Sequence, residues 1–73
     1  MMIWCVYILK CSDNSFYVGH TTDLNKRIET HNKGNGAQYT AVRRPVSLIY
    51  SESYNSQTEA VPREKQIKKW TRA

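Results

Sequence analysis

Two short apolar segments, Val6–Ile8 and Tyr17–Gly19, constrain the fold of this chain most strongly. Both are rich in β-branched and aromatic residues, and a polar cluster, Cys11–Ser15, separates them. The Asp-Asn pair inside that cluster favours a turn, so the pattern predicts a β-hairpin. The glycine that ends the second segment allows another backbone or a ligand to approach closely.

The length of the hairpin loop decides which side chains share a face of the sheet. A two-residue turn pairs Tyr7 with His20 and directs Tyr17 to the opposite face. A three-residue loop over positions 12–14 pairs Leu9 with Tyr17 and places both tyrosines on one side. The residue types alone leave both registers open.

The first strand extends from Met2 to Leu9 and is apolar on both of its alternating faces. Trp4 and Val6 lie on one face, and Cys5 and Tyr7 lie on the other. A strand that is apolar on both sides is usually central in its sheet and covered twice. We therefore expect this strand to occupy the middle of the sheet.

A helix over 23–33 follows the hairpin. Thr22 is a good N-cap for it, and Gly34 suits the left-handed position just after its end. Four side chains share one side of this helix: the apolar Leu24 and Ile28 and the polar Arg27 and His31. A helix that only faced solvent would keep its arginine away from the apolar stripe, which indicates a role for Arg27 and His31.

The second half of the chain contains a third strand and a second helix. Segment 37–45 is polar, and we expect an irregular excursion or a short ribbon there, whereas 46–50 has the pattern of a strand. Ser56 and Glu59 have capping-box spacing and open the second helix. Pro62 follows too late for a first turn, so we expect a kink or a late helix start.

At 73 residues the chain has the length of a single domain, 1–73. It has no apolar run long enough to span a bilayer and no basic-then-apolar leader, which favours a cytoplasmic protein without a membrane partner. Two cysteines, Cys5 and Cys11, are too few and too close for a disulfide framework, so we expect free thiols.

The formal net charge of +5 is unevenly distributed. Before Pro62 the basic and acidic residues nearly balance, whereas from Pro62 onward Glu64 alone opposes a basic run: Arg63, Lys65, Lys68, Lys69 and Arg72. A basic stripe of this kind suits a polyanion, most often a nucleic acid, and it also suits a solvated helix face.

Glu64 is the most informative single residue. It lies on the same helical side as Ala60 and Ile67, the side that should pack against the sheet. A carboxylate there must be paired, hydrogen-bonded or bound to a cation, because an isolated buried charge is too costly. The pattern leaves open a salt bridge to Arg27 and a metal site. Ile67 and Trp70, further along the helix, are expected to be core or helix-packing residues.

Val6-Tyr7, Tyr17-Val18-Gly19, Arg27 and Glu64 together resemble the GIY-YIG endonuclease superfamily. The resemblance covers almost the whole chain, and it is closest to small stand-alone bacterial members related to the nuclease domain of Slx1. It extends over several further segments: Thr21–Leu24, His31-Asn32, Gly36-Ala37, Tyr39-Thr40, Arg43–Pro45 and Arg63–Trp70. The first motif departs from the family name, reading Cys-Val-Tyr in place of Gly-Ile-Tyr.

The resemblance implies an α+β fold: a small three-stranded sheet with the first strand central, flanked by helices, in the order hairpin, helix, strand, helix. It implies endonucleolytic hydrolysis of DNA phosphodiesters with one Mg²⁺ or Mn²⁺ ion. Tyr7 and Tyr17 would position or deprotonate the attacking water. Arg27 would stabilise negative charge on the phosphate, and Glu64 would hold the ion. His31 matches a position hydrogen-bonded into the site, and two tyrosines in one site favour the three-residue loop.

The expected partner is DNA in a branched, flap or single-stranded form, in a reaction linked to repair or recombination. The residues expected to contact it are His20, Lys26, Tyr39, Arg43, Arg44, Arg63, Lys65, Lys68 and Lys69. Two alternatives stay open: a nucleic-acid-binding module of the same fold that cleaves poorly or not at all, and a domain that docks to a protein partner.

Overall fold

The computed structural model describes residues 2–36 and 38–71. Along the chain the elements are β1 (Trp4–Lys10), β2 (Phe16–Thr21), α1 (Leu24–Asn32), α2 (Gln38–Ala41), β3 (Ser47–Tyr54) and α3 (Gln57–Thr71). Within these described ranges, the helices are all too short or too polar to cross a membrane.

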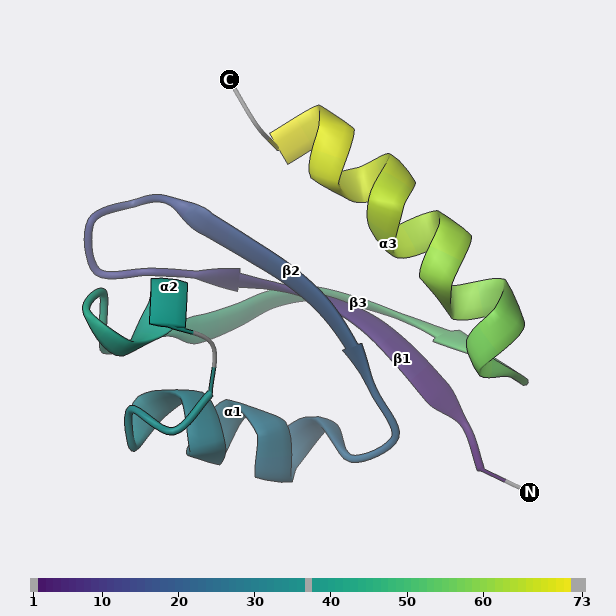
Figure 1. Cartoon of the computed structure of the whole chain (residues 1–73), viewed down its shortest axis with the longest axis horizontal. Helices are drawn as coiled ribbons and strands as arrows, with labels where there is room; N and C mark the ends of the chain where they lie inside the picture. The colour runs from purple at the N-terminus through teal and green to yellow at the C-terminus, as the bar shows by residue number, and fades with distance from the viewer. Residues whose placement is uncertain (1, 37, 72–73) are drawn as a thin grey trace.

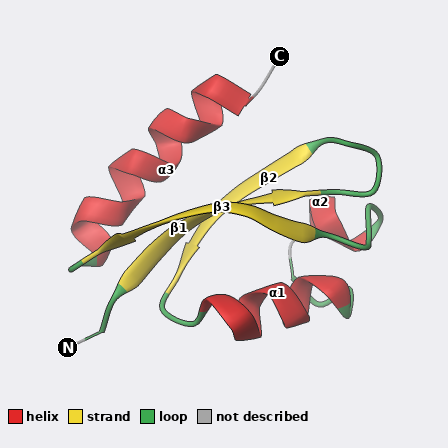
Figure 2. Ribbon diagram, turned by 180° about the vertical axis from the view of Figure 1, so that it is seen from behind, coloured by secondary structure: helices red, strands yellow, loops and turns green. Residues whose placement is uncertain are grey.

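The three strands form one antiparallel sheet in the order β2-β1-β3, so the doubly apolar first strand is central, as predicted. Helix α3 crosses one face of the sheet, while α1 and α2 lie on the other (Figures 1 and 2). Val6 and Val18 pack under α3 against Ala60 and Ile67. On the opposite face Tyr7 forms part of a second buried cluster, completed by Leu9, Cys11, Val46, Leu24 and Ile28. The expected α+β architecture is confirmed.

The hairpin has the three-residue loop that places both tyrosines on one face. Leu9 pairs with Tyr17 in the β1–β2 ladder. The backbone N–H of Cys11 donates to the carbonyl of Ser15 at 2.8 Å and closes the loop. Asn14 adopts φ 68°, a left-handed conformation that asparagine tolerates better than most residues.

The first helix is one residue shorter at each end than predicted, and Gly34 follows it in the predicted position. Gly34 has φ +86° and occupies the left-handed position after the helix. The N-cap is Asp23 and not Thr22: the Asp23 carboxylate accepts a hydrogen bond from the backbone N–H of Lys26 at 3.1 Å. A carboxylate at this position satisfies a free helix donor and also complements the helix dipole.

Three predictions for the second half of the chain need correction. Segment 38–41 forms the short helix α2, not a ribbon. The third strand runs to Tyr54, well past the expected end at position 50. Helix α3 begins at Gln57, where the Ser56 hydroxyl accepts from the Glu59 N–H, and it continues through Pro62. The late helix start is therefore wrong, and the capping interaction is confirmed.

Candidate active site

Tyr7 lies at the centre of the site, and Gly19 creates the space for it. The two residues are directly opposite each other in the β1–β2 ladder. Tyr7 is only 1% exposed, and a Cβ on Gly19 would come within 2.5 Å of its hydroxyl oxygen. The tyrosine ring therefore lies across the glycine, and its hydroxyl reaches the β2 side of the sheet.

His31, which is buried at the end of α1, connects the Tyr7 hydroxyl to α2. Its Nε2 lies 3.3 Å from the Tyr7 oxygen, and its Nδ1 lies 2.7 Å from Oγ1 of the buried Thr40. A Cβ on Gly36 would come within 2.4 Å of Nδ1, so this glycine leaves room for the imidazole. Tyr7, His31 and Thr40 form a continuous hydrogen-bonded chain through the interior.

The protonation states in this chain follow from burial. Burial raises the pKa of Tyr7 to about 12; the nearby Tyr17 and Glu64 add to the rise, and the Arg27 guanidinium opposes it. Burial also lowers the pKa of His31, and the positive charge of Arg27 lowers it further. At neutral pH the phenol therefore keeps its proton and the imidazole is uncharged, with one nitrogen able to accept.

Tyr17 and Arg27 complete the tyrosine side of the site. The ring centroid of Tyr17 lies 5.0 Å from that of His31 and 6.5 Å from that of Tyr7. Arg27 on α1 is exposed, but it is near enough to the Tyr7 hydroxyl to lower its pKa through a hydrogen bond and through charge. One polar surface thus carries a hydroxyl, a second tyrosine and a fixed positive charge.

Glu64 reaches the same region from α3, and both of its oxygens are engaged. His20 Nδ1 lies 2.6 Å from Oε1 and Lys68 Nζ lies 3.0 Å from Oε2, with the Glu64 side chain 13% exposed. Burial alone would raise the pKa of Glu64, but the hydrogen bonds from His20 and Lys68 outweigh it and the pKa is lowered. The partners are His20 and Lys68 and not Arg27, which was one of the two options left open by the sequence.

The donor set at Glu64 fits a weakly held hard cation. Mg²⁺ keeps several water ligands and needs only one or two carboxylates from the protein. Among the described residues there is no cluster of three or more His, Cys, Asp and Glu side chains that could hold a metal. A cation at Glu64 would therefore complete its shell with water and would take the place of His20 or Lys68.

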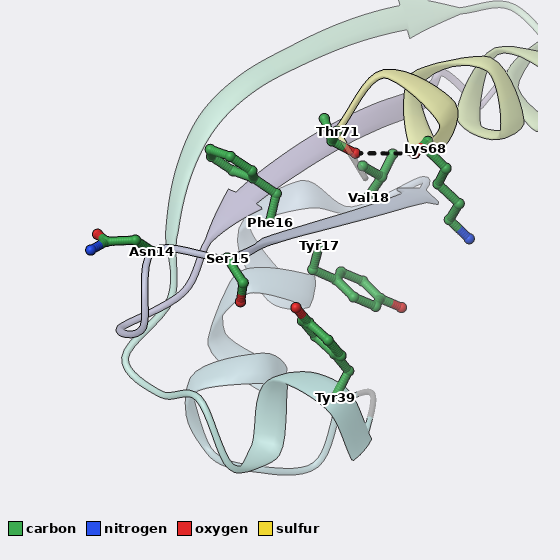
Figure 3. Close-up of a pocket in the computed structure, with 8 residues that line it drawn as sticks. All are labelled: Asn14, Ser15, Phe16, Tyr17, Val18, Tyr39, Lys68 and Thr71. Atoms are coloured by element: carbon green, nitrogen blue, oxygen red, sulfur yellow. Dashed lines mark hydrogen bonds between the residues drawn. The ribbon is translucent and has the colours of Figure 1, made fainter. Parts of the chain in front are cut away.

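A groove of about 730 Å³ adjoins this site along the outer edge of β2. Figure 3 shows Tyr17 and Tyr39 side by side at its wall, with Lys68 extending from α3. The remaining lining residues are Asn14, Ser15, Phe16, Val18 and Thr71.

The other cations expected to contact DNA fall into two groups. The guanidinium groups of Arg43, Arg44 and Arg63 are bound within the protein, by Asp13, by backbone carbonyls and by Glu52 respectively. Lys26, Lys65 and Lys69 are exposed and reach solvent. The basic run of α3 therefore presents Lys65 and Lys69, while Arg63 and Lys68 already have anionic partners.

A family model described as the GIY-YIG catalytic domain matches residues 3–73. The chain belongs to the GIY-YIG family. UPF0213 proteins from several Staphylococcus aureus strains are 57% identical to it over 67 residues, or 92% of this chain and 82% of theirs. A GIY-YIG catalytic domain points to nuclease chemistry on a nucleic acid. The narrower kinship with Slx1 stays a prediction.

Two solved structures carry the same GIY-YIG fold. The solution structure of a UPF0213 protein from Bacillus halodurans is 43% identical, with a TM-score of 0.57 over 93% of this chain and 72% of that chain. A protein from E. faecalis is 38% identical, with a TM-score of 0.62 over 94% and 74% of the two chains.

Three residues that shape this GIY-YIG site received no role from sequence reasoning. Gly36 and Thr40 hold the His31 imidazole, and Glu52 on β3 binds Arg63, the neighbour of Glu64. The strand alternation around Glu52, with Tyr50 and Tyr54 on the same face, was a usable signal for a carboxylate held by hydroxyls. Gly36 and Thr40 lie in segments that resemble the family, but the resemblance did not predict their contacts with His31.

Proposed function

We propose that this protein is a divalent-metal-dependent DNA endonuclease that hydrolyses phosphodiester bonds, selects its substrate by structure and acts in DNA repair or recombination inside the cytoplasm. The observation that supports this most directly is the cluster formed by Tyr7, His31 and Arg27 next to Glu64. Phosphodiester hydrolysis needs an oriented water and positive charge where negative charge accumulates. This cluster has side chains suited to both tasks.

Tyr7 acts in this proposal as a protonated hydroxyl that relays a proton. Its pKa of about 12 leaves it a poor base on its own at neutral pH. Its hydroxyl can donate to His31 Nε2, 3.3 Å away, while its oxygen accepts a hydrogen bond from water. As the water attacks, its proton passes to Tyr7 and the Tyr7 proton passes to the neutral His31.

Arg27 and Glu64 act in this proposal on the negative charge of the reacting phosphate. The Arg27 guanidinium stabilises the negative charge that develops on the phosphate oxygens. Glu64 would hold the divalent ion, which when bound supplies Lewis-acid polarisation of the phosphate and stabilises the departing oxygen. One buried-face carboxylate is consistent with one Mg²⁺ or Mn²⁺ ion rather than two.

The test is cleavage of labelled single-stranded, duplex, flap and branched DNA with Mg²⁺ or Mn²⁺. We expect Glu64→Gln and Arg27→Ala each to reduce cleavage by at least about 100-fold, since oxyanion stabilisation of this kind is worth roughly 10²–10³ in rate. The matched controls are Glu59→Gln on α3 and Lys33→Ala after α1, which should leave cleavage unchanged. Equal rates for Glu64→Gln and Glu59→Gln would contradict the proposal.

One observation favours a second candidate, a nucleic-acid-binding module that cleaves poorly. Both oxygens of Glu64 are held by His20 and Lys68, and a metal ion must compete with them. The binding module is supported over the nuclease if the wild type binds DNA without metal and does not cleave it, and if Lys68→Ala also fails to cleave.

A further inference from the structure

The groove along β2 is larger than hydrolysis at Tyr7 requires. Its volume of about 730 Å³ is in the range of sites that enclose a small molecule, and it lies outside the Tyr7–His31–Thr40 chain. β2 is an edge strand, since it pairs only with β1 in the sheet order β2-β1-β3. The groove is therefore open from the side of the sheet, where an extended chain can lie along it.

Two tyrosines form a prepared aromatic surface in this groove. The rings of Tyr17 and Tyr39 are stacked at an interplanar angle of 28°, with centroids 6.3 Å apart (Figure 3). Tyr39 is 40% exposed and lines the groove. It presents aromatic surface to the groove rather than to the core.

Arg43 holds Tyr39 in this orientation. Its guanidinium carbon lies 4.0 Å from the centre of the Tyr39 ring, and its NH1 donates to the Tyr39 carbonyl at 2.9 Å. The guanidinium is itself held by Asp13 in the hairpin loop, with Nε 3.0 Å from Oδ2. The ring therefore loses little conformational freedom when a ligand binds, which favours affinity.

The charge of the groove suits a nucleic-acid strand. Lys68 reaches it from α3, and the described residues that line it include no carboxylate. A DNA strand that laid its phosphates near Lys68 would also weaken the hold of this lysine on Glu64, whose Oε2 it contacts at 3.0 Å. Tyr17 belongs to both the groove and the site around His31, so a strand in the groove passes directly to the reacting centre.

We infer that this groove binds unpaired bases of single-stranded DNA on Tyr17 and Tyr39, so that the substrate carries a single-stranded segment next to the cleaved bond. The inference rests on the proposed function. The exposed Tyr39 ring and the partly exposed Tyr17 ring can accept any base because every base has a π-face, whereas the bases of a duplex are already stacked on one another. The groove therefore favours DNA strands whose bases are unpaired.

The test measures binding in metal-free buffer with EDTA, so that no cleavage intervenes. One oligonucleotide carrying 2-aminopurine is used as a single strand and again after annealing to its complement. Three variants are compared with the full wild-type chain: Tyr39→Leu, which removes the ring; Tyr39→Phe, which retains stacking; and Tyr50→Leu. Tyr50 is a matched control because it is 45% exposed on β3, the opposite edge of the sheet.

We expect Tyr39→Leu to weaken single-strand binding by about 10-fold, or about 1.4 kcal/mol, and to leave duplex binding unchanged. Tyr39→Phe and Tyr50→Leu should bind like wild type. The change in 2-aminopurine fluorescence at saturation should be smaller for Tyr39→Leu, which keeps only Tyr17, than for the other forms. Single-strand affinity within 2-fold of wild type in Tyr39→Leu, or an equal loss for duplex, would overturn the inference. Binding of neither DNA by wild type would instead remove the proposed function.

Circular dichroism of Tyr39→Leu separates loss of stacking from loss of α2. Native spectra with weakened single-strand binding support the groove. If Tyr39→Leu does not fold, Tyr39→Phe and Arg43→Gln are used in its place. Arg43→Gln releases the Tyr39 ring without removing it. It should weaken single-strand binding several-fold and leave duplex binding unchanged. Unchanged binding by a folded Arg43→Gln would overturn the role of the fixed ring.

Discussion

Gly19 is the residue whose lack of a side chain matters most to the site. A methyl group there would come within 2.5 Å of the Tyr7 hydroxyl and 2.8 Å of the ring carbon that carries it. We expect Gly19→Ala to lower the free energy of unfolding by about 1–3 kcal/mol through overpacking. Cleavage should fall by about 100-fold or more, because a shift of about 1 Å at a reacting group costs that much. Thermal unfolding and a cleavage assay measure the two effects.

Gly34→Ala is the control for this prediction. Gly34 has φ +86°, so alanine is strained there and stability should fall by about 1 kcal/mol. Its side chain would meet Arg44 and not Tyr7, so cleavage should be nearly unchanged. A similar loss of activity in both variants would show that general destabilisation, not the position of Tyr7, limits the reaction.

At the scale of elements, a single carboxylate ties β3 to the α3 helix. Glu52 accepts three hydrogen bonds from Arg63, at 2.8, 2.9 and 3.3 Å, and further bonds from the hydroxyls of Tyr50 and Tyr54. We expect Glu52→Gln to lower the free energy of unfolding by about 1–2 kcal/mol. In a domain of this size that corresponds to roughly 4–16 °C in the unfolding midpoint. Glu59→Gln, at an exposed acid in the first turn of α3, is the control and should cost less, about 0.3 kcal/mol from its interaction with the helix dipole.

The same contact predicts a pH dependence. The hydrogen bonds from Arg63, with help from the two tyrosines, hold the pKa of Glu52 at about 2, below its ordinary value of 4.5. A lowered folded-state pKa stabilises the protein above pH 4.5, and this stabilisation is lost as the pH falls from 4.5 toward 2. The difference in midpoint between wild type and Glu52→Gln should therefore shrink across this window. A difference that stays constant would mean that Glu52 is not the group being protonated.

The net charge of the whole molecule is +5, and exposed lysines make part of this charge available to a partner. Arg63 and Lys68 are bound to Glu52 and Glu64, which leaves Lys65 and Lys69 of α3 facing solvent. If each binds one phosphate of a single strand, replacing both with alanine should reduce the salt slope of log affinity by about 1.4. The control is Lys10→Ala with Lys33→Ala, which removes the same charge elsewhere. Equal slopes for the two double variants would contradict a directed DNA surface.

Much of the fold was predictable because its determinants are local or periodic. The apolar residues on both faces of the first strand predicted its central position, and the residue types of the loop predicted the hairpin. Gly34 marked the end of α1 because only a left-handed residue closes a helix in that way. Ser56 marked the start of α3 for a similar reason, since a capping hydroxyl acts on the backbone three residues away.

The local signals misled where two interactions of similar strength compete. Thr22 and Asp23 are both good caps, and the tertiary fold selected Asp23. Trp70, expected to be a core or helix-packing residue, is 64% exposed and packs on Arg63 of the same helix. It stays out of the core because the face of α3 that meets the sheet is filled by Ala60 and Ile67. A fifteen-residue helix over a three-stranded sheet has too little area to bury every apolar side chain.

Local patterns in the chain were sufficient to predict the hairpin, the central strand, the glycine after α1, the start of α3 and the residue types available for chemistry. The packing of the elements determines which side chains meet: Glu64 binds His20 and Lys68, Thr40 holds His31, and Glu52 holds Arg63. Apart from Glu64 and Lys68, which are one helical turn apart on α3, the partners in each pair belong to different elements. Hydrogen bonds and ion pairs act over a few ångströms, so the packing of the helices on the sheet selects them, and no local pattern records that choice.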